Sequence, residues 1–177
     1  GLSSGYFKNF GETQRLGIDL TIDAFNNKTK LGFKGFSINY SYLEATFQSA
    51  HTLPAANHPN SVNDVQAGDI IPGMPKHKIN TNVTYNVFKD LDITAGFIGA
   101  TGVYLRGDES NQLKKTAPYA VFNFQSEYTS KKNVKFFARI ENILNSDYET
   151  MGVLGEASSD EVNVPISELG DTGTGDN

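Results

Sequence analysis

Two histidines in one polar segment are the residues of this chain best placed to contact a metal-containing ligand. His51 and His58 flank the segment HTLPAANH and lie seven positions apart. This spacing matches no standard metal-binding motif, so we expect neither a resident metal ion nor a bound cofactor. Two solvated loop histidines are the simpler interpretation. Contact with a metal chelate is the functional interpretation, and it makes His51 and His58 the candidate ligand-binding residues.

A second group of potential metal ligands is the acidic segment near the C-terminus. Its carboxylates lack the spacing of a calcium-binding EF-hand loop, so a solvated acidic segment is the simpler interpretation. These carboxylates belong to Asp160, Glu161, Glu168, Asp171 and Asp176. The tripeptide Arg106-Gly107-Asp108 is interpreted as a coincidence of three letters.

Nucleophilic catalysis requires a nucleophile beside a base, and the sequence contains no recognisable arrangement of this kind. Ser41 and Ser126 lie in predicted strands without a histidine in a known motif. The one histidine next to a predicted strand, His77, belongs to a proline-containing lead-in. We therefore predict that the protein is not an enzyme.

The elements that position the candidate residues are predicted to be strands. Apolar and polar residues alternate along the chain with a period of two. In the segment VKFFARIE, which begins at Val134, the apolar residues share one face and Phe137 is the exception on the other. Successive side chains of a strand point to opposite faces, whereas a helix needs apolar residues three and four positions apart. The pattern predicts six strands, at residues 13–25, 31–48, 78–87, 91–105, 118–128 and 134–141.

Short and long connections alternate between these strands. Polar turns occupy residues 26–30, 88–90 and 129–133, and long loops occupy residues 49–67 and 106–117. A lead-in at 68–77 contains two prolines, which suits the rim of a sheet because proline cannot donate to a ladder. Short turns join antiparallel neighbours, so we predict an all-β antiparallel meander with all long loops at one end. Residues 153–177 show no convincing strand.

Three features favour a lipid-facing sheet over a soluble one that buries its apolar face. Most predicted strands have about 11–18 residues, whereas about 9–11 tilted residues cross a bilayer and globular strands average about 5–6. Short turns at one end and long loops at the other are typical of outer-membrane barrels. Aromatic residues gather towards both strand ends, as interfacial girdles do.

These aromatic residues form two predicted groups, one at each end of the sheet. The group near the short turns comprises Phe25, Phe33, Phe36, Tyr85, Phe88 and Tyr128. The group towards the long loops comprises Tyr40, Tyr42, Phe47, Tyr104 and Tyr119. A soluble β-sheet domain is the alternative, but it conflicts with the strand lengths and the one-sided loops.

Six strands are too few for a closed membrane barrel, since known barrels begin at about eight. An open edge would leave unpaired backbone groups in lipid. We therefore expect a larger transmembrane barrel, with most strands before residue 1 and at least one after residue 177. Residues 1–152 would supply strands, short periplasmic turns and long extracellular loops. Residues 153–177 would form an acidic extracellular loop before the last strand.

The polar faces of the strands carry amides and charges of both signs, which suits a hydrated lumen lining. These residues are Arg15, Asp19, Asp23, Lys78, Asn80, Asn82, Asn123, Gln125, Glu127, Lys135, Arg139 and Glu141. All 15 Lys and Arg residues precede residue 140, but they are scattered or lie in turns. Without a basic stripe we expect no nucleic-acid binding. Cysteine is absent, which excludes disulfides and thiol chemistry.

Four stretches of this sequence match motifs of one known family. They are Gly11 to Leu20, Tyr40 to Ala45, Gly68 to His77, and Arg139 to Leu144 with Asp147-Tyr148. In order and spacing the chain resembles the C-terminal part of the β-barrel of a TonB-dependent outer-membrane receptor. Asp19, where the family usually has Glu, and Asn145, near its usual Asp, are departures.

The resemblance implies a barrel of about 22 strands around an N-terminal plug. It implies active uptake of a scarce nutrient across the outer membrane of a Gram-negative bacterium. A ferric siderophore is the most frequent ligand of the family, with haem, cobalamin and glycans as others. The implied partners are outer-membrane lipid, the rest of the barrel and plug, the ligand, and the TonB energy-coupling complex through a segment outside this chain. A passive porin is the alternative function.

Overall fold

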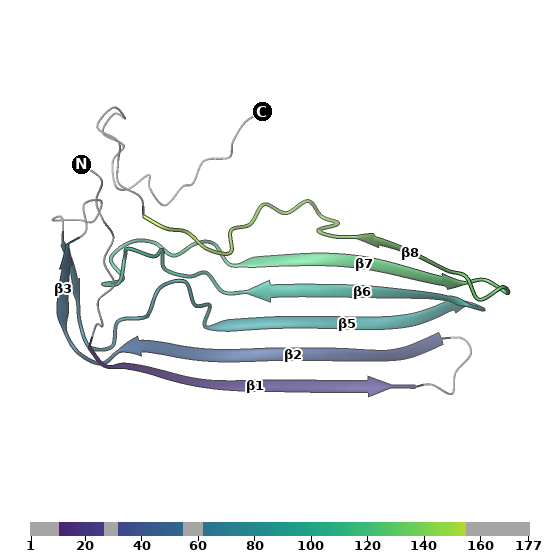
Figure 1. Ribbon diagram of the computed structural model, residues 1–177, viewed down its shortest axis with the longest axis horizontal. Helices are drawn as coiled ribbons and strands as arrows, with labels where there is room; N and C mark the ends of the chain where they lie inside the picture. The colour runs from purple at the N-terminus through teal and green to yellow at the C-terminus, as the bar shows by residue number, and fades with distance from the viewer. Residues whose placement is uncertain (1–10, 27–31, 55–61, 155–177) are drawn as a thin grey trace, which may run out of the picture.

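The computed structural model describes residues 11–26, 32–54 and 62–154, and most of them form one long antiparallel sheet (Figure 1). Its six strands follow the order β1-β2-β5-β6-β7-β8, and a separate hairpin, β3–β4, lies between β2 and β5 in sequence. The strands are β1 (Thr13–Phe25), β2 (Gly32–Phe47), β3 (His51–Pro54), β4 (Val62–Val65), β5 (His77–Phe88), β6 (Leu91–Ala100), β7 (Tyr119–Thr129) and β8 (Lys135–Ile140). The predicted all-β antiparallel meander is confirmed. In the part of the chain that the structure describes, no helix is long and apolar enough to span a membrane.

The register of the strands sorts the side chains of the sheet into one apolar and one polar face. Directly opposed residues of antiparallel strands share a face. One transverse row consists of Ile22, Ile38, Thr81, Phe97 and Phe122. The adjacent row lies on the other face and begins with Thr21, Asn39 and Asn80. Phe137, the predicted exception, pairs with Glu127 on the polar face.

Five strands, β1, β2, β5, β6 and β7, are long enough to cross the apolar part of a bilayer. β5 has 12 residues. At about 3.4 Å per residue it is about 40 Å long. A tilt of about 40° leaves about 30 Å along the membrane normal, more than the apolar band of about 25 Å in outer-membrane barrels. The sheet therefore crosses the apolar band and continues beyond it.

Two segments differ from the sequence-based prediction. The strand predicted at 91–105 ends at Ala100, because the next residues pair with loop segments. Thr116 N donates to Val103 O at 2.9 Å, and Gly73 N donates to Tyr104 O at 3.0 Å. The loop predicted at 49–67 contains the β3–β4 hairpin, whose strands have only four residues each. Strands this short show no alternation that a sequence pattern could reveal.

The polarity of the two faces inverts near the loop end of β2. Tyr40 and Tyr42 lie on the apolar face. Beyond Tyr42 the same side carries Glu44, whereas the opposite side carries Ala45 and Phe47, which are 3% and 7% exposed. Loop segments cover this opposite side, so β2 passes from the apolar band into an aqueous level between Tyr42 and Glu44.

The best-buried apolar residues of the described chain gather at this loop end. They are Ala45, Phe47, Val65, Ala100, Val103, Leu105 and Val121. Phe47 belongs to this core, so its predicted place in an outer aromatic girdle is wrong. Tyr119 pairs with Ala100 and Phe25 pairs with Gly35, which puts these two aromatic residues on the polar side as well. Tyr40 and Tyr42 keep the girdle position.

A turn held by one asparagine side chain ends the pairing of β8. Asn142 adopts a φ of 50°, its Nδ2 donates to Ser146 O at 2.9 Å, and its Oδ1 accepts from Ser146 N at 2.9 Å. Asn142 N donates to Asn123 Oδ1 at 2.9 Å. Tyr148 then stacks on Tyr119, with ring centroids 4.9 Å apart. Beyond the turn the chain continues alongside β7 to the loop end of the sheet (Figure 1).

β1 and β8 form the two edges of the described sheet (Figure 1). Nearly every residue of both strands is exposed, including the apolar Leu16, Ile18 and Phe136. A long edge with such apolar side chains is a template for pairing with further strands. The sheet therefore has the form of a segment of a larger barrel wall.

Candidate functional site

A pocket of about 310 Å³ opens at the loop end of the sheet. Three segments contribute to it: the end of β2 with β3, residues 71–74, and residues 106–109. Its lining residues are Phe47, His51, Leu53, Ile71, Pro72, Met74, Arg106 and Glu109. Because Phe47 continues the polar side of β2, the pocket lies on the side that lines the lumen of a barrel.

Aromatic and apolar groups form the floor of the pocket. The His51 and Phe47 rings meet edge to face, with centroids 5.3 Å apart and planes at 71°. His51 Nδ1 lies 3.1 Å from Ser49 O, which orients the imidazole. Phe47 and Pro72 are buried beneath the opening. A floor of this kind favours planar and apolar parts of a ligand.

One carboxylate, of Glu109, and one guanidinium, of Arg106, line the same pocket without pairing with each other. Glu109 Oε1 accepts a hydrogen bond from Gly107 N at 3.1 Å, and Glu109 Oε2 accepts one from Asn63 Nδ2. Within residues 11–26, 32–54 and 62–154, none of the ion pairs includes Arg106. The exposed Arg106 guanidinium is therefore the group best suited to attract an anion.

Two asparagines connect the loop segments that build the pocket. Asn63, on β4 and 1% exposed, donates from Nδ2 to Gly107 O at 2.8 Å and accepts Ser110 N at 2.7 Å. Asn111 accepts Ile70 N at 2.6 Å and donates to Ile70 O at 2.9 Å. Asn63 is buried and Asn111 is half-buried, and side-chain amides with both ends engaged restrict the relative motion of the segments they join. The hairpin, the 68–73 segment and the 106–113 loop therefore form one hydrogen-bonded unit.

The carboxylate of the Arg106-Gly107-Asp108 tripeptide stabilises a turn. Asp108 is 0% exposed, and its two oxygens accept Gln112 N at 2.9 Å and Leu113 N at 3.0 Å. A buried carboxylate engaged by backbone amides cannot be presented to a partner. This geometry agrees with the interpretation of the tripeptide as a coincidence.

Of the two candidate histidines, His51 lines the pocket and His58 lies outside the described residues. The sequence analysis missed Arg106, Glu109 and Asn63. These residues lie in segments without periodicity, and the cluster RGDES was a local sign of charge for Arg106 and Glu109 alone. Among the residues described, no group of three or more His, Cys, Asp or Glu side chains could hold a metal ion.

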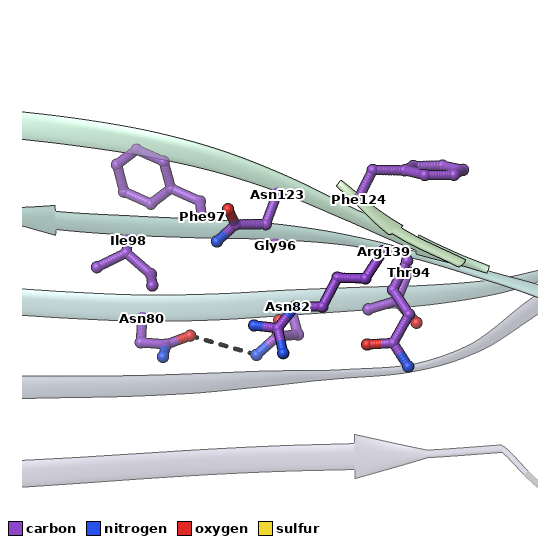
Figure 2. A pocket seen from close by; sticks show the side chains of 10 residues that line it. Asn80, Asn82, Thr94, Gly96, Phe97, Ile98, Asn123, Phe124 and Arg139 are labelled. Carbon is purple, nitrogen blue, oxygen red and sulfur yellow. Dashed lines mark hydrogen bonds between the residues drawn. The ribbon is translucent and has the colours of Figure 1, made fainter. Parts of the chain in front are cut away.

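A second hollow, of about 180 Å³, lies midway along the polar face (Figure 2). The polar side chains that line it are Asn80, Asn82, Thr94, Asn123, Gln125 and Arg139. Gly96 leaves room for them, because a Cβ at this position would lie 2.9 Å from Asn82 Oδ1. In Figure 2, Arg139 extends from β8 towards Asn82. This surface of amides and one guanidinium has the composition expected of a hydrated lumen wall.

A cluster on the apolar face marks the outer boundary of the apolar band. Tyr40 Oη lies 2.8 Å from His77 Nδ1, and the His77 ring also packs against Tyr42, with centroids 5.3 Å apart. Lys76 Nζ donates to Glu44 Oε1 at 3.2 Å and lies 5.5 Å from the Tyr42 ring centroid. The hydrogen bond to Glu44 raises the pKa of Lys76 above its ordinary value. Aromatic rings with a polar end and a lysine are typical of a membrane–water interface.

The two-faced sheet, its crossing length, its open edges and the pocket on its polar side define a wall segment of an outer-membrane β-barrel. Residues 1–143 match the family model described as "TonB dependent receptor-like, beta-barrel". This match covers well over half of the chain, so the chain belongs to that family.

A solved structure shows the same fold. The crystal structure of the siderophore receptor PiuA from Acinetobacter baumannii matches with a TM-score of 0.65 and 22% sequence identity. The match covers 82% of this chain and 20% of the PiuA chain, so the present chain spans about a fifth of that receptor. None of the curated protein sequences compared matches this chain.

Proposed function

We propose that the whole receptor imports a ferric siderophore actively across the outer membrane of a Gram-negative bacterium. The observation that carries this proposal is the pocket at the loop end of the sheet, on its lumen side, with its aromatic floor and its Arg106 guanidinium. Membership of the TonB-dependent receptor family and the fold shared with a siderophore receptor support it. His51 contributes to ligand contact in this proposal, and no enzymatic step is involved.

The proposed orientation places the short turns in the periplasm and the pocket outside the cell. The segments 48–76 and 101–118 and the acidic segment 153–177 then belong to the extracellular loops. The apolar face contacts lipid, and the polar hollow around Gly96 faces the plug. The plug and the segment that engages the TonB energy-coupling complex belong to parts of the receptor outside this chain.

Iron uptake by cells that lack their own receptors tests the proposed function. The full-length receptor, expressed under iron limitation, is expected to restore uptake of radioactive iron supplied as a siderophore complex. Loss of TonB or of the proton-motive force is expected to abolish this uptake. Uptake that persists without TonB would instead identify a passive channel.

Replacing Leu53 by glutamine in the full-length receptor is expected to weaken binding of the transported chelate about tenfold. A leucine buried against a ligand contributes about 1.5–3 kcal/mol, and about 1.4 kcal/mol corresponds to a factor of ten. Isothermal titration calorimetry, or quenching of the intrinsic protein fluorescence, measures the affinity of the purified receptor. Thr52→Gln is the matched control, because Thr52 is exposed on the neighbouring position of β3 and does not line the pocket. Equal affinities of the two variants would contradict ligand binding in this pocket.

A further inference from the structure

We infer that Asn63 makes this pocket selective for anionic ligands by holding the Glu109 carboxylate away from the Arg106 guanidinium. The inference rests on the proposed function, because it names the chemical class of ligand that the same pocket receives. Arg106 is the group that touches the ligand, and Asn63 is a positioning residue that acts through Glu109.

The arrangement of Glu109 shows why a positioning residue is needed. Glu109 and Arg106 lie three positions apart in one loop and line the same pocket, so an ion pair between them is the ordinary expectation. Both carboxylate oxygens are engaged elsewhere, one by Gly107 N and the other by Asn63 Nδ2. Without the Asn63 amide, one oxygen loses its donor, and Arg106 is the cation that lines the same pocket.

The Asn63 side chain is itself held in a single orientation. It is 1% exposed and sits on β4, where it pairs with Leu53 of β3. Its Nδ2 also donates to Gly107 O at 2.8 Å, and its Oδ1 accepts Ser110 N at 2.7 Å. Rotation of a buried amide with both ends engaged would leave polar groups unsatisfied. The Asn63 amide therefore presents a fixed donor to Glu109.

Hydrogen bonds hold the Arg106 backbone on both sides, and its side chain lines the pocket beside Gly73. Arg106 N donates to Gly152 O at 2.9 Å, and Leu154 N donates to Arg106 O at 2.8 Å, which fixes the backbone. A Cβ at position 73 would lie 3.4 Å from Arg106 Nε, and Gly73 has a φ of 77°. Glycine at position 73 thus permits the left-handed turn, and the Arg106 side chain packs beside it.

These contacts define the chemical class of the ligand. A guanidinium without a carboxylate partner binds deprotonated oxygens, and the Phe47–His51 floor accommodates a planar ring beside them. Iron chelates with catecholate oxygens combine both properties, and carboxylate chelates supply the negative charge alone. Neutral hydroxamate chelates of iron lack the negative charge. The pocket therefore favours anionic over neutral ferric chelates.

The test compares anionic and neutral probes on the full-length receptor in proteoliposomes. The probes are a trianionic ferric tris-catecholate, a neutral ferric tris-hydroxamate and iron-free dihydroxybenzoate, with affinities measured by calorimetry. Arg106→Gln is expected to weaken binding of both anionic probes about tenfold, the effect of one lost charge-assisted hydrogen bond, and to leave the neutral chelate unchanged. Asn63→Ala is expected to give the same selective loss. The double variant Asn63→Ala/Glu109→Gln is expected to recover most of the anion affinity.

Glu109→Gln alone keeps the inference testable even if Asn63→Ala disturbs the hairpin. The glutamine Oε1 can accept one of the hydrogen bonds that Glu109 makes, and its amide cannot form an ion pair with Arg106. Loss of the Glu109 charge is expected to raise the anion affinity of this variant only slightly, well below tenfold. A tenfold gain would show that Glu109 already neutralises Arg106, and it would overturn the inference.

The remaining outcomes separate this inference from the proposed function. Lack of recovery in the double variant, with the neutral chelate still bound, overturns the role of Asn63 and leaves siderophore uptake intact. Arg106-dependent binding of dihydroxybenzoate without binding of any ferric complex supports the anion selectivity and contradicts iron uptake. Binding of no probe to the natural protein contradicts both.

Discussion

Replacing Ile38 by arginine in the full-length receptor is expected to destabilise the barrel by about 2–4 kcal/mol. Ile38 lies in the transverse row with Ile22, Thr81 and Phe97, close to the middle of the apolar face. A charged side chain at the bilayer midplane must be dehydrated or must draw water and headgroups inwards. None of the other residues in this row is charged, so none could form an ion pair with the arginine.

The neighbouring residue provides the matched control for this prediction. Asn39 lies on the polar face, is exposed and accepts a hydrogen bond from Thr21 Oγ1 at 3.0 Å. Asn39→Arg is expected to change the free energy of unfolding far less, because a hydrated lumen tolerates the charge. The free energy of unfolding of both variants is measured by reversible folding into lipid vesicles, with far-UV circular dichroism recorded against denaturant concentration. Equal destabilisation of the two would mean that the apolar face does not contact lipid.

The second large effect is expected at Gly102, at the boundary between β6 and the following loop. A Cβ at this position would collide with the carbonyl oxygen of Thr116, which belongs to the backbone and cannot rotate away. Gly102→Ala therefore forces the segments 101–105 and 116–118 apart, at a cost of about 1–3 kcal/mol or more. The buried Val103 and Leu105 lose their packing, and the loop unit opens.

Hydrogen exchange of the loop amides measures this opening in the full-length receptor. Protection of Val103 and Thr116 is expected to fall, while the amides of the strands within the apolar band keep theirs. Ala117→Val adds bulk to an exposed neighbour and is expected to leave the exchange rates unchanged. Unchanged protection in Gly102→Ala would refute the tight packing of these two segments.

The sheet could be predicted from the sequence because its signal is periodic and local. Alternation placed β1 at its observed bounds, and it assigned Phe137 to the polar face. The period weakens from Ile98 onwards, where the backbone leaves the regular ladder to pair with loop segments, and there the prediction ran past Ala100. A local sequence pattern cannot predict a segment whose conformation is set by hydrogen bonds to distant loop residues.

The pocket could be predicted only in part. His51 was recognised by its chemistry, but its position beside Phe47 and Arg106 depends on contacts between distant segments. The bond from Asn63 to Gly107 spans 44 positions, and no spacing rule connects such residues. The same holds for Phe47, which was assigned to the girdle from its place near the strand end, because the polarity inversion along β2 is a property of the assembled loop core.

The inversion of polarity along β2 fixes how deeply the protein sits in its membrane. Shifting the sheet inwards by one residue pair would bring the Glu44–Lys76 pair into hydrocarbon, and shifting it outwards would expose the apolar rows to water. Both displacements cost free energy, so the vertical position is held from both directions. The pocket begins at Phe47, beyond this boundary. Under the proposed function, a ligand is therefore captured at a constant height above the hydrocarbon, in the hydrated layer at the loop end of the barrel.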